Sequence, residues 1–376
     1  MGGVMRTAAV PTVVLLVAGA LASCGLSAKA GSESGAGGGS STTAVARQDA
    51  PPLADVTPLS DVRDWDGEVD AVADAPIDPV ADDPEPALPT TVTDAQGTKV
   101  TVEDTSRILA LDVYGTLSRT VFELGLGDRL VGRDVSTEFD EAKGLPLVTQ
   151  NGHDLNAEAI LGLDPTVIIT DTSLGPWDVV LQMRDAGIPV VVVDSDRTLD
   201  NVAELIHQVA DPLGVPQAGD ALAQRTQRQI DQVTAQIANV APSDSGDKLR
   251  MVFLYVRGQS GIYYMFGEGS GADSLIDAIG GYDVADEIGW NGMKPLTDEG
   301  LVAAQPDLVL MMSAGLESAG GVDGLLDRLP ALANTPAGQH RRFVTMDDSQ
   351  ILGFGPITAS VLNALAVAAY APEEVR

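Results

Sequence analysis

The sequence predicts an α/β protein with two similar lobes joined by one long helix. First, a stretch that reads as helix, proline and buried strand occurs twice, at residues 156–169 and 297–310. Second, short apolar runs alternate with helical stretches around both copies, which is typical of parallel sheets with helical crossovers. Third, residues 217–239 contain no proline and carry a narrow apolar stripe at helical spacing.

The repeated stretch has the same landmarks in both copies. A capping residue, Asn156 or Thr297, is followed two positions later by Glu158 or Glu299, and a proline stands seven residues beyond each glutamate. The cap oxygen accepts from free backbone N–H groups, and the proline ring ends the helix. Two ordinary αβ units would share the caps and the strands, but they would not require matching glutamates. We therefore expect a shared role for Glu158 and Glu299.

The N-terminus has the features of an export signal. Arg6 precedes an apolar run from residue 8 to 21, which is short for a bilayer span. The run ends in small residues before Cys24, the only cysteine in the chain, and this arrangement resembles the bacterial lipobox. We expect residues 1–23 to be removed and Cys24 to carry lipid, including a diacyl group. An ordinary signal peptide with a chance cysteine is the alternative.

The organisation of the rest follows from composition and periodicity. Residues 24–89 are rich in glycine, alanine and proline, and between residues 49 and 85 there are twelve acids and one base. Such a segment buries little apolar surface, so we expect an extended, disordered tether. Residues 90–198 form an N-terminal αβ lobe, 199–245 a helical connector, and 246–376 a C-terminal αβ lobe. A helix of 23 residues spans about 35 Å, enough for a stiff link between lobes.

Composition excludes several functions. The formal net charge is −32, which disfavours a nucleic-acid partner because phosphate binding needs basic patches. One cysteine and three histidines provide neither a disulfide framework nor a metal cluster of those residues. No glycine-rich phosphate loop or nucleophile elbow is visible in the sequence, so nothing points to an enzyme.

Three residues could hold a metal-containing ligand. His153 stands in a loop just before the first repeated helix, where a lobe opens. Tyr255 and Arg257 are two positions apart at the end of an apolar run, so on a strand they share a face. A guanidinium favours a neighbouring phenolate, which is an iron(III) ligand. Each of the three is also compatible with a purely structural role.

The signal, the lipobox, the two αβ lobes and the long helix together resemble the class III substrate-binding proteins of ABC importers. These proteins capture vitamin B12, ferric siderophores or haem, and they consist of two Rossmann-like αβ lobes joined by one long rigid helix. The family docks on its permease through one glutamate in each lobe. The resemblance covers about residues 90–371 and implies that Glu158 and Glu299 contact a permease dimer.

The chain resembles the haemin-binding lipoproteins of actinobacterial haem importers (HmuT-like) in its sequence segments 109–119, 132–137 and 151–155 and in Tyr255 and Arg257. This resemblance implies that haem b, the transported ligand, is clamped between His153 and Tyr255 and that Arg257 supports the tyrosine. Candidates for the pocket wall are Tyr114, Arg133, Thr172 and Met293.

The expected function is therefore haem capture at the outer face of the cytoplasmic membrane and delivery to an ABC permease, without catalysis. Haem-carrier surface proteins are candidate upstream partners. The same fold with a ferric siderophore or a corrinoid as ligand is the alternative. Siderophore sites need several basic groups, which this chain has in small number.

Overall fold

The computed structural model describes residues 49–376. The predicted signal peptide, Cys24 and the first part of the predicted tether lie outside the described residues. Within residues 49–376, no helix is both long and apolar enough to cross a membrane.

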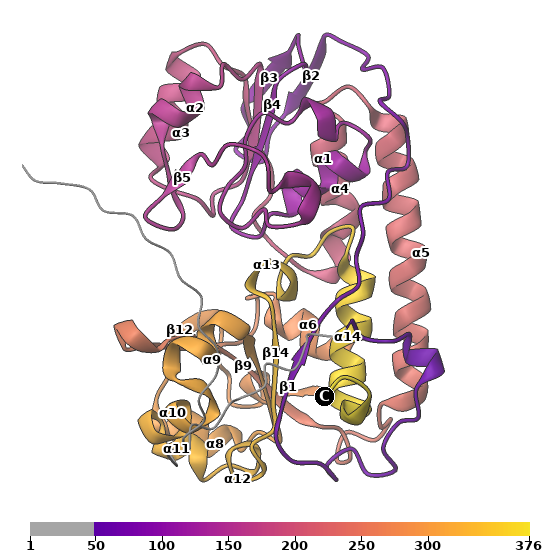
Figure 1. Cartoon of the computed structure of the whole chain (residues 1–376), viewed down its shortest axis with the longest axis vertical. Coiled ribbons are helices and arrows are strands. Elements are labelled where there is room, and N and C mark those ends of the chain that lie inside the picture. Colours follow the sequence, from indigo (N-terminus) through magenta and orange to yellow (C-terminus); the bar gives the residue numbers. More distant parts are fainter. Residues whose placement is uncertain (1–48) are drawn as a thin grey trace, which may run out of the picture. The chain divides into compact units, whose positions relative to one another are not determined.

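The N-terminal lobe is built on a three-stranded parallel sheet in the order β4-β7-β8 (Ile108–Leu111, Val167–Thr170 and Val190–Val192). Every residue of these strands is buried, because helices cover both faces. Helix α1 (Thr116–Glu123) packs on one face, and α2 (Ala157–Gly162) and α3 (Trp177–Asp185) pack on the other (Figure 1). The lobe also has two hairpins, β2-β3 (Thr90–Thr93, Lys99–Val102) and β5-β6 (Thr149–Gln150, Asp154–Leu155).

The C-terminal lobe contains a larger mixed sheet in the order β1-β14-β13-β9-β10-β12, with β11 beside β9. The first four strands are parallel to one another, and β10 pairs antiparallel with both β9 and β12. The strands are β1 Glu68–Ala71, β9 Arg250–Arg257, β10 Ile262–Phe266, β11 Tyr282–Asp283, β12 Met293–Pro295, β13 Leu308–Met312 and β14 Phe343–Met346. The helices are α6 Ala272–Ala278, α7 Val284–Glu287, α8 Asp298–Ala304, α9 Ser313–Ala319, α10 Gly321–Arg328, α11 Pro330–Ala333, α12 Pro336–His340, α13 Asp348–Ile351 and α14 Thr358–Tyr370.

The repeated stretch forms the predicted unit in both lobes. The Asn156 side chain accepts from the N–H groups of Glu158 and Ala159, and the Thr297 side chain accepts from the Gly300 N–H. These caps start α2 and α8, and the buried strands β7 and β13 follow the two prolines. The prediction of helix, proline and buried strand is confirmed at both places.

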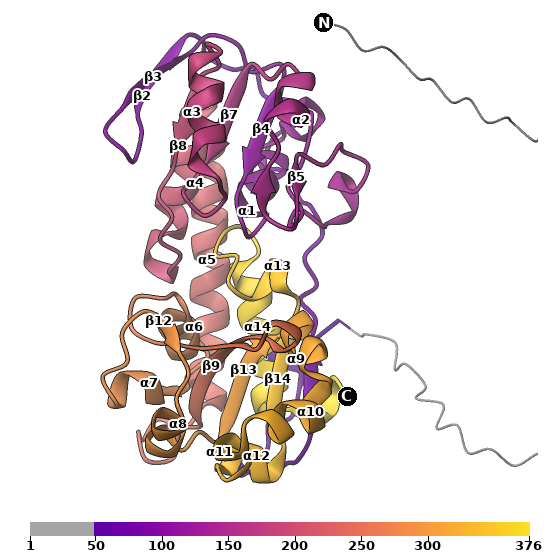
Figure 2. The same ribbon diagram turned by 90° about the vertical axis from the view of Figure 1, so that its left-hand side faces the viewer.

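The predicted long helix is also confirmed. Helix α5 (Pro216–Val240) extends along both lobes (Figures 1 and 2), and the shorter α4 (Val202–Ala210) packs against it. Its buried stripe includes Leu222, Ile230, Val233 and Ile237. Proline at the first helical position suits the start of the helix, since its missing N–H would have no partner there.

The expectation of a disordered tether is wrong for residues 49–89. Residues of β1 pair in parallel with β14, so this segment supplies the edge strand of the C-terminal sheet. Leu53, Trp65 and Val69 are buried in the main core. The acidic residues of this segment stay exposed or half-buried because they lie in turns or between inward positions, whereas single apolar residues point inward. The segment has too few apolar residues for its sequence to predict a strand. Their alternation with polar residues is nevertheless sufficient for β1 to pack on the core.

The segment between β1 and β2 passes from the C-terminal lobe to the N-terminal lobe beside α5 (Figures 1 and 2). Residues 72–89 are called the strap below. The Val80 N–H donates to Glu123 O, the Ala87 N–H donates to Gly214 O, and Arg225 donates to Asp78. The lobes are therefore joined by the strap as well as by α5.

Candidate functional site

Tyr255 and Arg257 occupy the end of β9, a central strand of the C-terminal sheet. Both are half-buried, whereas Val256 between them is buried, so the two side chains share one face as predicted. The Tyr255 ring stacks on Phe266 of the neighbouring strand, with ring centroids 6.1 Å apart. The guanidinium carbon of Arg257 lies 4.7 Å from the centroid of the Tyr255 ring. Packing thus fixes the phenol ring at the C-terminal end of β9.

Asp348 is a partner of Arg257 that the sequence analysis missed. Arg257 Nη2 donates to Asp348 Oδ2 at 3.1 Å, and Nη1 donates to the Val256 carbonyl at 3.2 Å. Within the described part of the chain, Asp348 Oδ1 is buried without a hydrogen-bond partner. The arginine therefore stacks on the tyrosine ring and pairs with Asp348. Asp348 begins α13, far from β9 in the sequence, so no local pattern could reveal the pair.

His153 lies at the tip of the β5-β6 hairpin of the N-terminal lobe, where it is exposed. Asn151 and Gly152 have positive φ angles of 49° and 91°, which make the tight turn. Although the His153 side chain is exposed, nearby protein atoms partly desolvate it and lower its pKa from 6.5; the positive charge of Arg257 lowers the pKa further, whereas Asp348 and Asp154 raise it. His153 is therefore within electrostatic reach of the Arg257–Asp348 pair in the other lobe.

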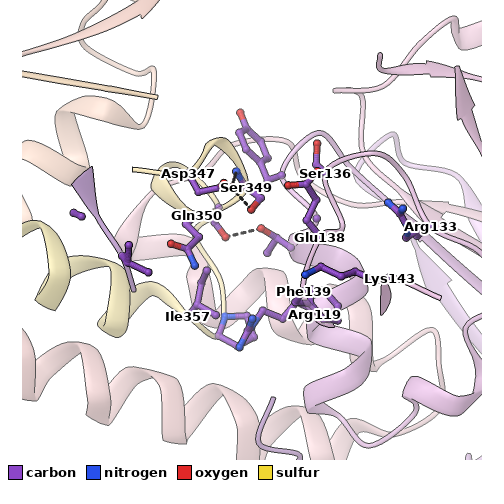
Figure 3. Close-up of a pocket in the computed structure, with 17 residues that line it drawn as sticks. Arg119, Arg133, Ser136, Glu138, Phe139, Lys143, Asp347, Ser349, Gln350 and Ile357 are labelled. Carbon is purple, nitrogen blue, oxygen red and sulfur yellow. Dashed lines mark hydrogen bonds between the residues drawn. The ribbon is translucent and has the colours of Figure 1, made fainter. Parts of the chain in front are cut away.

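A cavity of about 480 Å³ lies between the lobes (Figure 3). The wall that the N-terminal lobe contributes carries three basic side chains, Arg119, Arg133 and Lys143, and the acid Glu138. Its C-terminal wall is formed by residues 347–357, and Asp347 and Ser349 of this wall flank Asp348. His153 and Tyr255 do not belong to its lining, but Asp347 and Ser349 do, so the cavity lies next to Asp348, the partner of Arg257.

The predicted pocket residues divide into two groups. Tyr114 and Arg133 line the cavity, whereas Thr172 and Met293 are exposed and are not among its lining residues. Arg133 Nη1 donates to the carbonyls of Asp134 and Thr137. The wall beside Tyr114 depends on Gly115, whose φ is 70° and where a Cβ would approach Ser136 O to 2.6 Å.

Behind this wall lies a buried acidic cluster that the sequence analysis also missed. Arg197 Nη2 donates to Asp171 at 2.6 Å and lies 3.5 Å from Asp112, and its guanidinium carbon is 5.3 Å from the centroid of the Tyr114 ring. Burial, with the nearby Asp171 charge, raises the pKa of Asp112 to about 7, and burial raises the pKa of Asp134 to about 6. Asp112 and Asp171 each follow a buried strand directly, which is a signal that could have located the cluster.

Glu158 and Glu299 are exposed near the starts of α2 and α8, one in each lobe. Neither belongs to the cavity between the lobes.

Comparisons with known proteins agree with this architecture. The profile of a family described as periplasmic binding protein matches residues 113–350. A crystal structure of the heme binding protein HmuT is 40% identical with a TM-score of 0.78, and the match covers 83% of this chain and 99% of that one. HmuT structures also include variants in which an arginine, a tyrosine or a histidine is replaced by alanine.

Two curated relatives are more distant. The ABC transporter substrate-binding lipoprotein YvrC of Bacillus subtilis (strain 168) is 24% identical over 75% of this chain and 86% of that protein. A cobalamin-binding protein of Halobacterium salinarum is 25% identical over 60% of this chain and 58% of that protein. The family profile and the likeness to HmuT along nearly its whole length lead to one conclusion: the chain belongs to the periplasmic binding protein family and has its class III architecture.

Proposed function

We propose that this protein captures haem outside the cytoplasm and delivers it to an ABC permease. In this proposal, His153 of one lobe and Tyr255 of the other bind the two faces of the haem iron, and no catalytic step occurs. The observation that carries the proposal is that the Tyr255–Arg257 pair lies at the C-terminal end of β9, where the Arg257 charge acts on His153 of the β5-β6 hairpin. One ligand from each lobe would exclude water from both faces of the iron and would hold the lobes together.

The chemistry of the two side chains suits iron(III). Neutral imidazole and phenolate both bind the ferric ion. The lowered pKa of His153 keeps its imidazole neutral over more of the pH range. Arg257, whose guanidinium carbon lies 4.7 Å from the centroid of the Tyr255 ring, would stabilise the negative charge of an iron-bound tyrosinate. The HmuT variants support these assignments, because the tyrosine and the arginine replaced there are two positions apart, as Tyr255 and Arg257 are.

Haem also carries two propionate groups, which need positive or hydrogen-bonding partners. The wall formed by Arg119, Arg133 and Lys143 is a surface of that kind, in the cavity whose other wall includes Asp347 and Ser349, the neighbours of Asp348. We assign the propionate edge of haem to this cavity. Arg119 is buried and Arg133 half-buried, so solvent would screen their charges little, although Arg119 already pairs with Glu123 and Lys143 with Asp140.

Titration of the purified protein with haemin tests the proposed ligand. We expect a saturable shift of the Soret band at one haemin per protein, and no comparable binding of cyanocobalamin. Cyanocobalamin is included in the titration because a curated relative is named a cobalamin-binding protein. Saturable cyanocobalamin binding without a haemin-induced Soret shift would replace haem by a corrinoid as the ligand.

The partner and the location belong to the same proposal. A lipid on Cys24 would hold the protein at the outer face of the cytoplasmic membrane, and Glu158 and Glu299 would contact a permease dimer. We expect the double variant Glu158→Ala, Glu299→Ala to bind haemin normally and to lose haem uptake in cells. Normal uptake by that variant would contradict the role of the glutamates in docking.

A further inference from the structure

Six large apolar side chains are exposed in the described part of the chain, and two of them occupy the same place in the repeated unit. The six are Leu147, Leu161, Leu181, Ile262, Met293 and Val302. Leu161 stands three residues after Glu158, and Val302 stands three residues after Glu299. Their exposed fractions are 45% and 57%.

The helix geometry places each apolar side chain beside its glutamate. Residues three apart are neighbours on one helix face. Ile160 in α2 and Leu301 in α8 are buried, and they supply the inward contacts of the two helices. Leu161 and Val302 follow them directly and point to the outer surface, where packing in this protein does not require an apolar side chain.

Each lobe thus presents a carboxylate and an aliphatic side chain in the same arrangement. Both helices lie on the side of the molecule away from α5 (Figure 1). We call Glu158 with Leu161 the upper patch and Glu299 with Val302 the lower patch. The same surface occurring twice suits a partner that offers one complementary surface twice, as a symmetric dimer does.

The charges narrow the choice of partner. A second copy of this chain would bring carboxylates against carboxylates, and an anionic lipid surface would repel them. A protein with a basic residue beside an apolar socket complements each patch. This argument rests on the proposed delivery to a permease, and it specifies the contact.

We propose that Leu161 and Val302 are the apolar anchors of the permease contact and that they enter two equivalent sockets, each bordered by a basic residue that pairs with Glu158 or Glu299. The glutamates determine where the protein docks on the permease. The aliphatic side chains form the centre of each contact, from which water is excluded, and so stabilise the interface.

Photo-crosslinking in intact cells tests this proposal without requiring a bound ligand. The photo-reactive amino acid p-benzoylphenylalanine replaces Leu161 in one variant and Val302 in another. Leu181, an equally exposed leucine on α3, and Gln224 on α5 serve as control positions. We expect positions 161 and 302 to crosslink to the same ABC permease polypeptide, identified by mass spectrometry, and both control positions to give no such product.

A functional measurement accompanies the crosslinking. The double variant Leu161→Asn, Val302→Asn is compared with Leu181→Asn for uptake of haemin in cells that lack the wild-type gene. We expect uptake to fall at least tenfold in the double variant and to stay within twofold of wild type in the control, with haemin binding unchanged in both. Normal uptake by the double variant, or equal crosslinking at all four positions, would overturn the proposal.

The outcomes also separate this inference from the proposed function. Crosslinks to a permease from positions 161 and 302, together with no Soret shift in the purified protein, would retain the contact and remove haem as the ligand. Loss of uptake in the glutamate variant but not in the Leu161, Val302 variant would retain docking and remove the apolar anchors.

Discussion

At the scale of single residues, the environment of Arg257 is the most informative feature of the site. The guanidinium stacks on the Tyr255 ring and pairs with Asp348, so its charge is shared between a candidate iron ligand and an acid on another element. Asp348 partly neutralises the charge that would favour the phenolate. We expect Asp348 to limit how tightly the iron is held, which suits a protein that must release its ligand.

This expectation can be tested by the substitution Asp348→Asn. Asparagine retains an oxygen for the bond from Arg257 Nη2 but removes the negative charge. We predict that haem transfer to apomyoglobin becomes several-fold slower, because the full Arg257 charge then supports the phenolate. In an Arg257→Ala background the same substitution should have a smaller effect, because only the direct influence of Asp348 on His153 then remains. Faster transfer in both backgrounds would contradict this role.

The pH dependence of haem binding follows from His153. Its pKa lies below 6.5, so the neutral imidazole that binds iron predominates at pH 6.5 and above. We predict that below pH 6.5 the haemin affinity of the wild type falls more steeply than that of His153→Ala, by up to tenfold per pH unit, because protons then compete with iron for this imidazole. His153→Ala should remove the part of the fall that is due to this group. An identical fall in wild type and variant would assign the effect to another group.

The sequence allowed the candidate site residues to be named but not their contacts. Tyr255 and Arg257 could be paired from strand periodicity alone. Asp348 and the basic cavity wall could not, because they join elements distant in sequence and depend on how the lobes meet. Thr172 and Met293 are exposed and do not line the cavity of Figure 3, so their place in the wall of the haem pocket stays a prediction.

At the scale of elements, the N-terminal segment shows where composition misleads. Its twelve acids between residues 49 and 85 indicated disorder, yet β1 completes the C-terminal sheet. An edge strand needs apolar residues on few positions, and here buried Val69 and Ala71 alternate with exposed Glu68 and with half-buried Asp70, which accepts from Thr345. The repeated helix–strand units were predictable because their caps, prolines and apolar runs are local signals.

The structural role of this segment predicts the effect of Trp65→Ala. The Trp65 side chain is buried in the main core, with the Arg376 guanidinium carbon 5.1 Å from its ring centroid. Removing it should lower the free energy of unfolding by about 3–5 kcal/mol, measured by urea denaturation. Asp64→Ala, at an exposed neighbouring position, should change it by less than about 0.5 kcal/mol. Equal stability of the two variants would mean that the segment contributes little to the fold.

At the scale of the whole molecule, the two lobes are held at several points. Helix α5 and the strap connect them, Thr116 Oγ1 donates to Gly353 O, and the Leu199 N–H donates to Ser274 Oγ. The long helix was predicted from its uninterrupted pattern. The strap was not, because its hydrogen bonds to α1 and to the turn before α5 leave no periodic signal in the sequence.

The buried acidic cluster gives the stability of the molecule an unusual pH dependence. The folded-state pKa of Asp112, about 7, lies above its ordinary value of 3.8, so the stabilising protonated form is lost as pH rises through 7. We predict that the melting temperature rises from pH 8 to pH 6 and that Asp112→Asn reduces this rise. Asp140→Asn, at an exposed acid, should leave the profile unchanged. An unaltered slope in Asp112→Asn would show that Asp112 is already ionised at pH 6.

The central claim is that haem iron is held by one residue from each lobe. The most direct measurement is the haem content and Soret spectrum of the double variant His153→Ala, Tyr255→Ala after size-exclusion chromatography. We predict that wild type retains haem, that Tyr255→Ala changes the spectrum most, His153→Ala less and Arg257→Ala least, and that the double variant elutes without haem. A double variant that keeps the wild-type Soret band and haem content would show that the iron is held elsewhere.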